Sequence, residues 1–358
     1  MRLKFRSSEF GVRSFGSRLR RCLGGQARGI ALIMVLWVVA VLSVIVLEFC
    51  FAMRTEINIT KNYKEELQSY AMAEGGVQRA ILELIYKQDP RVQQLRKPSK
   101  LEETPPEKRE WVTDGRPYLL SYDRGVCEIR VMSEAGKVNI NLVSEQMIRK
   151  ILENLGVDSE TKEIIADSIM DWRDPDDFYR VNGAENDYYQ SLKEPYFCKN
   201  APLSSIEEML LIRGITPDLF YGKKGKREEE AKEQQTGLKD IFSIYSPMQQ
   251  IDVNSATTDV LRTTLGISPE MARKIVEVRE EKAFEHQGDL LQRVPELVPL
   301  IGQIGPLIAY RTTTPYYTIE SRAKNNEGGY KRGIKVIVKI ATAEKQNYKL
   351  IQWVDVLL

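Results

Sequence analysis

An uninterrupted apolar segment near the N-terminus is the strongest pattern in the chain. Residues 30–47 read IALIMVLWVVAVLSVIVL, with Ser43 as the only polar side chain. At about 1.5 Å per residue this segment reaches about 27 Å as a helix, close to the hydrocarbon thickness of a bilayer, about 30 Å. The run ends at Glu48, and apolar residues continue to Met53. We therefore predict a transmembrane helix over residues 30–53.

A basic segment precedes this helix. Residues 1–29 contain eight lysines and arginines and a single acid, Glu9. Since lysine and arginine stay on the cytoplasmic side, this leader predicts a cytoplasmic N-terminus and an exported C-terminal part. A cleaved secretory signal has the same charge pattern, but its apolar region spans about 7–15 residues and ends at a small-residue cleavage site. The longer run here, without that site, favours a retained single-pass anchor.

Helical spacing of apolar positions predicts that the helix continues over residues 54–88. Gly75 and Gly76 form a weak point in it, since glycine in a helix costs about 1 kcal/mol relative to alanine. Residues 89–116 are rich in proline and charge and predict a linker.

Strand-like runs lie on both sides of a long helical region. Residues 117–134 contain two such runs joined by a turn signal at 123–125, and residues 310–358 contain three more. The intervening residues 135–309 predict an all-α insertion that carries a charged insert at 222–237. This arrangement predicts one antiparallel sheet packed on the continuing helix, and hence an α+β fold.

The insertion contains an internal repeat. Residues 138–141 and 251–254 are extended segments ending in asparagine, each followed by a helix, a Leu-Gly-Val/Ile turn and a second helix ending in arginine; residues 205–216 form a partial third copy. These helix pairs resemble helix-hairpin-helix modules, which hold DNA phosphates at a helix N-terminus. The second glycine of that module is replaced by Asp158 and Ser268. Because an aspartate caps the helix but repels a phosphate, a hairpin scaffold is favoured over DNA binding.

Composition and charge narrow the function. The chain has 358 residues and a net charge of +2, and the leader contributes +7, so the remainder is mildly acidic, near −5. General nucleic-acid binding, which needs a basic face, is therefore not expected. His286 is the sole histidine, and no nucleophile–base arrangement is apparent, so we predict no enzymatic activity. Cys127 and Cys198 either form a disulfide or stay buried and unpaired, and their spacing leaves both open.

Residues 170–189 form an acidic cluster, MDWRDPDDFYRVNGAENDYY. So many carboxylates repel one another unless cations neutralise them, and calcium takes about 6–8 oxygen ligands from a flexible loop. Two alternatives stay open, a calcium site or a surface loop whose acids pair with Arg173, Arg180 and Lys199. The expected calcium ligands are Asp174, Asp176 and Asp177 first, then Asp171 and Glu185.

Together these segments resemble the K-type minor pseudopilins of type II secretion systems. The resemblance follows the family order through RGIALIMVLWVVAVLSVIVLEF, AMAEGGVQRAILELI, GKVNINLVS, DSIMDWRDPDD, GAENDYY, KNAPLSSIEEMLLIRGITPDLF and IYSPMQQIDVNSATTDVLRTTLG. It implies a pilin-like fold, in which a long N-terminal transmembrane helix packs on a small antiparallel sheet and the helical domain is inserted between strands. It also implies cleavage by prepilin peptidase between Gly29 and Ile30, with N-methylation of Ile30.

The resemblance further implies a place in an assembly. Most pilins carry glutamate at the fifth position of the mature chain, where it pairs with the terminal amine of the subunit above, but here that position is Met34. A lone carboxylate in a bilayer is costly, so its absence fits a subunit with nothing above it. We expect the assembly helix, with Met34, Trp37 and Glu48, to pack beside other minor pseudopilins. The expected function is to cap the pseudopilus tip and to initiate its assembly or limit its length during export of folded proteins.

The implied partners are the I-type and J-type minor pseudopilins, the H type, the major pseudopilin, prepilin peptidase and the inner-membrane assembly platform. The expected location is the inner membrane, single-pass, with a cytoplasmic N-terminus and a periplasmic C-terminal domain. The alternative is a membrane-anchored helix-hairpin-helix protein that binds DNA in an uptake system.

Overall fold

The computed structural model describes residues 26–88, 111–222, 236–326, 330–341 and 347–357. Almost all of the predicted leader, most of the linker and most of the charged insert lie outside these residues. The chain forms two compact units, Met1–Glu65 and Glu66–Leu358.

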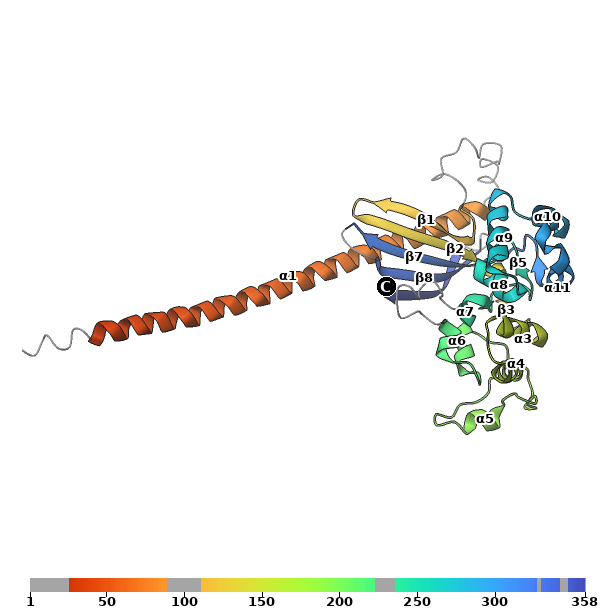
Figure 1. Ribbon diagram of the computed structural model, residues 1–358, viewed down its shortest axis with the longest axis horizontal. Coiled ribbons are helices and arrows are strands. Elements are labelled where there is room, and N and C mark those ends of the chain that lie inside the picture. The colour runs from red at the N-terminus through yellow and green to blue at the C-terminus, as the bar shows by residue number, and fades with distance from the viewer. Residues whose placement is uncertain (1–25, 89–110, 223–235, 327–329, 342–346, 358) are drawn as a thin grey trace, which may run out of the picture. The chain divides into compact units, whose positions relative to one another are not determined.

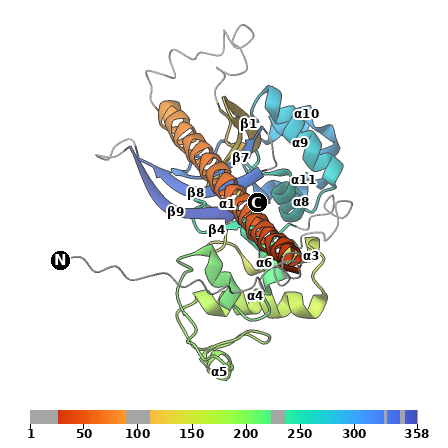
Figure 2. The same ribbon diagram turned by 90° about the vertical axis from the view of Figure 1, so that its left-hand side faces the viewer.

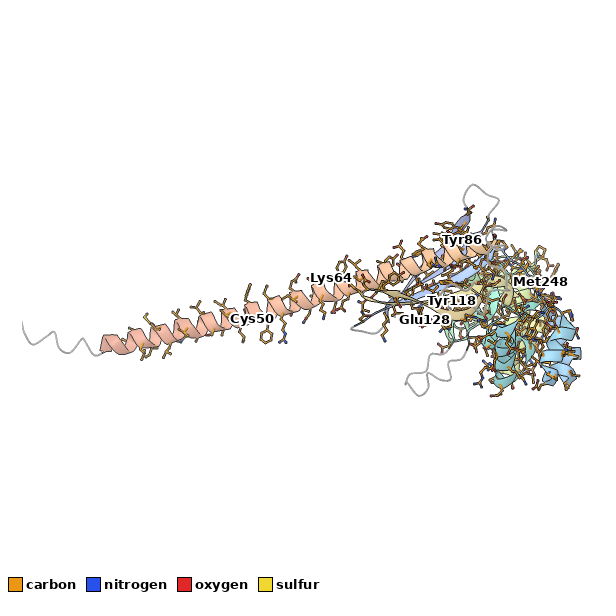
Figure 3. The ribbon with its side chains drawn as sticks, turned by 90° about the horizontal axis from the view of Figure 1, so that it is seen from above. Cys50, Lys64, Tyr86, Tyr118, Glu128 and Met248 are labelled. Carbon is orange, nitrogen blue, oxygen red and sulfur yellow. The ribbon has the colours of Figure 1, made fainter. Side chains whose placement is uncertain are left out.

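Helix α1 spans Gln26–Gln88 and contains the predicted anchor. From Ile30 onward it is the one helix of the described residues that is long and apolar enough to cross a membrane, and no part of its apolar window is buried. Ser43 Oγ donates to the carbonyl of Val39 at 2.8 Å, so its polar group is satisfied within the helix. Cys50 is also exposed on α1 (Figure 3). Such a surface needs lipid or other apolar helices around it.

The second unit contains a five-stranded antiparallel sheet, visible in Figure 1. Its strands, in spatial order, are β1 (Asp114–Tyr122), β2 (Gly125–Ser133), β7 (Tyr316–Asn325), β8 (Tyr330–Ile340) and β9 (Tyr348–Leu357). The two-residue turn between β1 and β2 confirms the predicted hairpin. Strands β2 and β7, which lie on opposite sides of the insertion in sequence, pair from Gly125–Asn325 to Ser133–Tyr317. The predicted α+β fold, with a helical insertion between strands of one sheet, is confirmed.

The part of α1 that belongs to the second unit packs on this sheet. Its apolar stripe, including Val77 and Ile81, forms one buried cluster with Ile129 of β2 and Val336 of β8. Gly76 has a role that its helix propensity does not reveal, because a Cβ there would lie 2.5 Å from Ser321 Oγ and 2.7 Å from Cys127 Sγ. Glycine is therefore what allows the helix to approach the sheet closely.

The insertion forms two groups of helices, which Figures 1 and 2 both separate. The first consists of η3 (Glu134–Gly136), β3 (Val138–Asn139), α3 (Glu145–Asn154), α4 (Ser159–Arg173), α5 (Asn186–Gln190), η4 (Ile206–Leu211), α6 (Pro217–Tyr221), α7 (Leu238–Ile241) and β4 (Phe242–Ser243). The second consists of β5 (Ile251–Asp252), α8 (Thr258–Leu265), α9 (Pro269–Glu281), α10 (Gln287–Arg293), η6 (Pro295–Leu300), α11 (Ile301–Ile304), η7 (Gly305–Leu307) and β6 (Ile308–Ala309). The insertion is thus not purely helical, since β3 pairs with β4 and β5 with β6 in short parallel ladders.

The internal repeat has a structural counterpart. Arg173, at the end of α4, donates to the carbonyls of Ile140 and Val143 at 2.5 and 2.6 Å. Arg279 of α9 donates in the same way to Val253 and Ala256, both at 2.7 Å. The asparagines of the repeat also act alike: each side chain exchanges two hydrogen bonds with a distant backbone, Asn141 with Leu203 and Asn254 with Phe284.

The hairpin turns are closed by side chains. Gly156, Gly214 and Gly266 adopt left-handed φ angles of +78°, +86° and +67°. Asp158, Thr216 and Ser268 lie two positions after these glycines, and the side chain of each caps the helix that follows. Each cap accepts one N–H of the helix N-terminus that would face a phosphate, and the cap by Asp158 is the one that the sequence predicted.

Cys127 and Cys198 are both buried and free. Cys127 lies in the core beneath the sheet, where its Sγ is 3.0 Å from Ser321 Oγ, whereas Cys198 belongs to the core of the insertion. Of the two alternatives that the sequence left open, the disulfide is therefore wrong, because the two thiols belong to different cores.

Candidate assembly helix and acidic site

The residues predicted for processing and assembly all lie on α1. Ile30, Met34 and Trp37 have exposed side chains, and Glu48 follows the apolar run. Met34 and Trp37 are three residues apart and so share one face of the helix. This segment of α1 offers a continuous apolar surface with no carboxylate before Glu48.

The acidic cluster begins in the last turn of α4 and ends at α5. Asp171 lies in α4, Asp174 caps its C-terminal end, and Glu185 stands at the N-terminal boundary of α5 without a capping hydrogen bond. Burial is the main cause of the raised pKa of Glu185, and the negative charges of Asp171, Asp174 and Asp177 raise it further. The structure therefore brings these four predicted ligands within electrostatic reach of one another.

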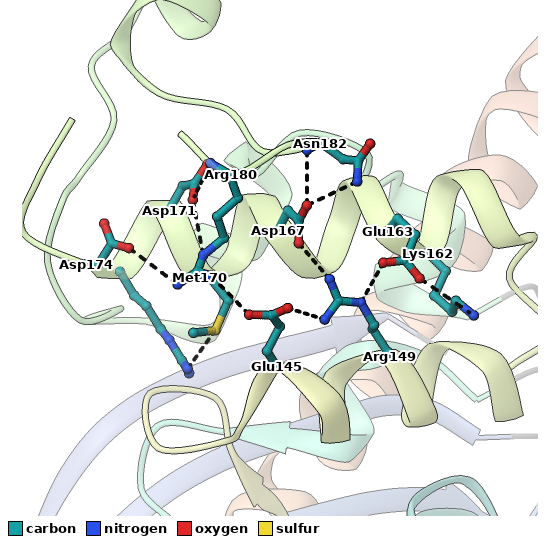
Figure 4. A network of polar contacts seen from close by, with 11 residues as sticks. Glu145, Arg149, Lys162, Glu163, Asp167, Met170, Asp171, Asp174, Arg180 and Asn182 are labelled. Atoms are coloured by element: carbon teal, nitrogen blue, oxygen red, sulfur yellow. Dashed lines mark hydrogen bonds and ion pairs between the residues drawn. The ribbon is translucent and has the colours of Figure 1, made fainter. Parts of the chain in front are cut away.

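Arg180 bridges part of this cluster to helix α3. Its guanidinium lies 3.4 Å from Asp171, 4.0 Å from Asp174 and 3.1 Å from Glu145 (Figure 4). The fully buried Asp171 also accepts the backbone N–H of Arg180 at 3.1 Å. Despite these contacts, burial raises the pKa of Asp171 to about 6.

The other predicted pairings differ from the expectation. Arg173 binds backbone carbonyls instead of the acidic loop, and Lys199 pairs with Glu208 of η4 at 2.7 Å. Among the three expected cations, Arg180 alone pairs with the acidic cluster in the described part of the chain. The exposed Asp176 uses Oδ1 to accept the Phe178 N–H at 2.9 Å, an ordinary turn contact.

Several buried oxygens in the cluster have no hydrogen-bond partner among the described residues. They are both carboxylate oxygens of Glu185, which is 3% exposed, Oδ1 of Asp174 and Oδ1 of Asn200. Burial is the main cause that raises the pKa of Glu185 to about 7, and the weakly donating Cys198 thiol opposes this rise without offsetting it. Burial likewise raises the pKa of Asp174. Unpartnered buried acceptors are costly, and a water molecule, a hydrogen-bond donor or a cation can satisfy them.

The donor set fits a hard cation such as calcium, because it consists of carboxylate and amide oxygens. Within the described residues, no three acidic, histidine or cysteine side chains already form a metal-binding arrangement. The fit therefore rests on the unpartnered oxygens of Asp174, Glu185 and Asn200.

Sequence reasoning missed two asparagines in this site. Asn186 and Asn200 both donate to Asp177 Oδ1, at 2.8 and 2.9 Å. Asn200 also has a positive φ of 47°, a conformation that asparagine tolerates better than most residues. Nothing in the sequence near residue 200 connects it with a loop more than twenty positions earlier, and only folding brings them together.

Comparison with known proteins decides the family. The family pattern "Type II secretion system (T2SS), protein K" matches residues 129–221, and a helix-hairpin-helix motif matches residues 246–300. A type II secretion system protein K from Pseudomonas aeruginosa is 24% identical over 82% of this chain and 83% of its own length. The chain belongs to the type II secretion system protein K family.

Further relatives agree with this family. The Pectobacterium carotovorum protein K is 39% identical over 21% of this chain and 23% of its own length. The crystal structure of the GspK-GspI-GspJ complex from enterotoxigenic Escherichia coli contains a chain of the same fold, with a TM-score of 0.51, 18% identity, and coverage of 84% of this chain and 99% of that one.

Family membership settles the coarse function. The chain is a minor pseudopilin of a type II secretion system and acts in protein transport. Its N-terminal apolar helix fits a single-pass membrane anchor. The DNA-binding alternative is not favoured, although the second hairpin matches the helix-hairpin-helix motif.

Proposed function

We propose that this chain occupies the tip of the pseudopilus. The observation that carries the proposal is the membrane segment of α1, which has Met34 where most pilins have glutamate and no carboxylate before Glu48. An acid inside a bilayer is retained only where a partner charge compensates its cost. A subunit without it makes no charge pair with a subunit above, and the tip is the position that requires none.

The proposed assembly follows from the same helix. Prepilin peptidase cleaves between Gly29 and Ile30, Ile30 becomes N-methylated, and the helix is held in the inner membrane with its N-terminus in the cytoplasm. Its exposed apolar surface then packs beside the helices of I-type and J-type minor pseudopilins, the types found with the K protein in the related GspK-GspI-GspJ complex. The H type, the major pseudopilin and the assembly platform complete the predicted set of partners.

The insertion is a large folded body that lies between strands β2 and β7 in the sequence. It runs from η3 to β6 and has its own buried core. A body of this size blocks addition of a further subunit, and the chain thereby caps the filament, initiates its assembly or limits its length. The pseudopilus then drives folded proteins across the outer membrane.

The N-terminus of the membrane-purified chain tests this proposal. Its mass is measured in cells with and without prepilin peptidase. We expect a chain that begins at Ile30 and carries one methyl group, formed only when the enzyme is present. An intact N-terminus, or a cut beyond Phe51, contradicts assembly into a pseudopilus.

We further propose that the acidic site binds calcium through Asp174, Asp177, Glu185 and Asn200, with Asp171 and Asp176 nearby. The ion would supply positive charge to the buried carboxylate of Glu185 and would contact the unpartnered Oδ1 atoms of Asp174 and Asn200. Millimolar calcium should raise the unfolding temperature of the chain, and Glu185→Gln should abolish most of that rise. Glu160→Gln, on an exposed part of α4, serves as the control and should leave the rise intact. An unchanged melting curve on addition of calcium contradicts the site.

A further inference from the structure

Asn186 joins two segments of the acidic site that are separate in the sequence. Its side-chain amide donates to Asp177 Oδ1 at 2.8 Å, and its own Oδ1 accepts the backbone N–H of Cys198 at 2.9 Å. One side chain therefore holds the loop that follows α4 to the segment that precedes η4. Both polar groups of Asn186 are used in these bonds, whereas Glu185 and Asn200 keep the unpartnered oxygens that are the proposed ion ligands.

Asn200 acts on the same carboxylate from the other segment. It donates to Asp177 Oδ1 at 2.9 Å and to the carbonyl of Asp176 at 2.8 Å. Two amide donors thus converge on one oxygen of Asp177. Because amides are neutral, they fix the orientation of this carboxylate without compensating its charge, as a lysine or arginine in their place would. The negative charge stays available to a cation.

The cations beside these two segments contact other groups. Lys199 pairs with a glutamate of η4 at 2.7 Å, and Arg213 donates to a backbone carbonyl at 2.9 Å. Arg180 pairs with the acids of α3 and of the C-terminal end of α4 (Figure 4). Within the described part of the chain, none of these three cations forms an ion pair with Asp177 or Glu185.

We infer that Asn186 is a positioning residue of the proposed ion site. It is not a ligand; it holds Asp177 and the backbone at Cys198 in place before an ion binds. Ligands that are oriented in advance bind more tightly because less conformational entropy is lost. Groups that orient metal ligands typically contribute about 10–100-fold to metal affinity. This inference rests on the proposed calcium site and concerns a residue outside its set of ligands.

Calcium titration of the full chain in detergent tests the role of Asn186. The dissociation constant is obtained from the rise in unfolding temperature over a range of calcium concentrations. We expect Asn186→Ala to weaken calcium binding about 10–100-fold. Asn182→Ala is the matched control, because this side chain lies in the same loop but donates to Asp167 Oδ2 at 3.2 Å, a carboxylate that is not a proposed ligand. The control should keep the dissociation constant of the native chain.

Hydrogen exchange at the backbone amide of Cys198 adds a test that needs no ion. This N–H bonds to Asn186 Oδ1, so it should exchange slowly in the calcium-free native chain. Asn186→Ala should speed its exchange about tenfold, since one hydrogen bond is lost. Fast exchange in the native chain would overturn the positioning role, even if the variant failed to fold.

The outcomes separate the positioning role from the ion site itself. A native chain that gains no stability from calcium would refute the proposed site and the positioning role with it. If calcium does stabilise the native chain, an unchanged dissociation constant in Asn186→Ala would refute the positioning role alone. An equal loss of affinity in Asn182→Ala would show that any lost contact in this loop has the same effect, and it would also overturn the role of Asn186.

Discussion

At the scale of single residues, side-chain size is decisive where the helix meets the sheet. Gly76 faces Ser321 and Cys127, and Ser321 Oγ donates to the carbonyl of Ala73 at 2.7 Å. The hydroxyl of a strand thus bonds directly to the backbone of a helix. This contact requires a close approach that no side chain larger than hydrogen permits at position 76.

Gly76→Ala should therefore destabilise the chain, although alanine is the better helix former. Overpacking of this kind costs about 1–3 kcal/mol, more than the gain of about 1 kcal/mol in helix propensity. Gly75→Ala is the matched control, because its Cβ would meet only the movable hydroxyl of Tyr122. Urea unfolding of the chain in detergent measures both variants, and equal stabilisation by the two alanines would contradict this account.

At the scale of elements, two arginines each tie the end of a helix to the extended segment that opens its own repeat. Arg279 is the more buried of the two and also lies 3.6 Å from Asp114 at the start of β1. Arg116 lies 2.7 Å from the same carboxylate. Burial acts to raise the pKa of Asp114, but the hydrogen bond from Arg116 and, to a smaller extent, the charge of Arg279 hold this pKa below its ordinary value. Helix α9 is thereby linked to the sheet as well as to its own repeat.

Arg279→Lys should cost about 3 kcal/mol, because an ammonium cannot reach two carbonyls and a carboxylate in the same geometry. Arg273→Lys, on an exposed part of the same helix, should change the free energy of unfolding by less than about 0.5 kcal/mol. Denaturant titrations compare the two variants. A similar small effect for both would show that the buried arginine contributes only its charge.

At the scale of the whole second unit, Glu134 joins the insertion to the sheet. Its buried carboxylate contacts Lys137 at 3.0 Å, accepts from Thr318 of β7 at 2.6 Å and also accepts from Ser243 of β4. Burial acts to raise the pKa of Glu134, but Lys137 and the two hydroxyls together hold it below its ordinary value. The ionised form is thus preferred in the folded chain.

The pH dependence follows from this direction. Because the folded-state pKa of Glu134 is lowered, its contribution is present above the unfolded-state value, about 4.5, and is lost as pH falls through the folded-state value. Glu134→Gln should lower stability at pH 7 by about 3 kcal/mol. The difference from the native chain should shrink in acid.

Urea titrations at neutral and acidic pH measure this change. Glu128→Gln is the control, since its ion pair with Arg130 lies nearer the surface and surface pairs contribute about 0–1 kcal/mol. A difference for Glu134→Gln that stayed constant down to acid pH would contradict the role of its charge.

The sequence by itself determined the features that depend on neighbours along the chain. The apolar run from Ile30 fixes the anchor helix, and the glycine turns with their capping residues fix the hairpins, because periodicity and capping act over a few residues. The sequence also showed the repeated asparagine and the arginine that ends each helix pair. It did not show which backbone groups these side chains contact. Strands on both sides of a helical region were enough to predict the sheet with its insertion.

Only the tertiary structure decided features that join distant residues. It placed Cys127 and Cys198 in separate cores, and it showed that Gly76 is a point of close approach between the helix and the sheet. In the acidic site it assigned Arg180 to Asp171 and left the oxygens of Glu185 without partners. Burial and long-range pairing arise from the packed fold, so no local pattern could have predicted which carboxylates remain uncompensated.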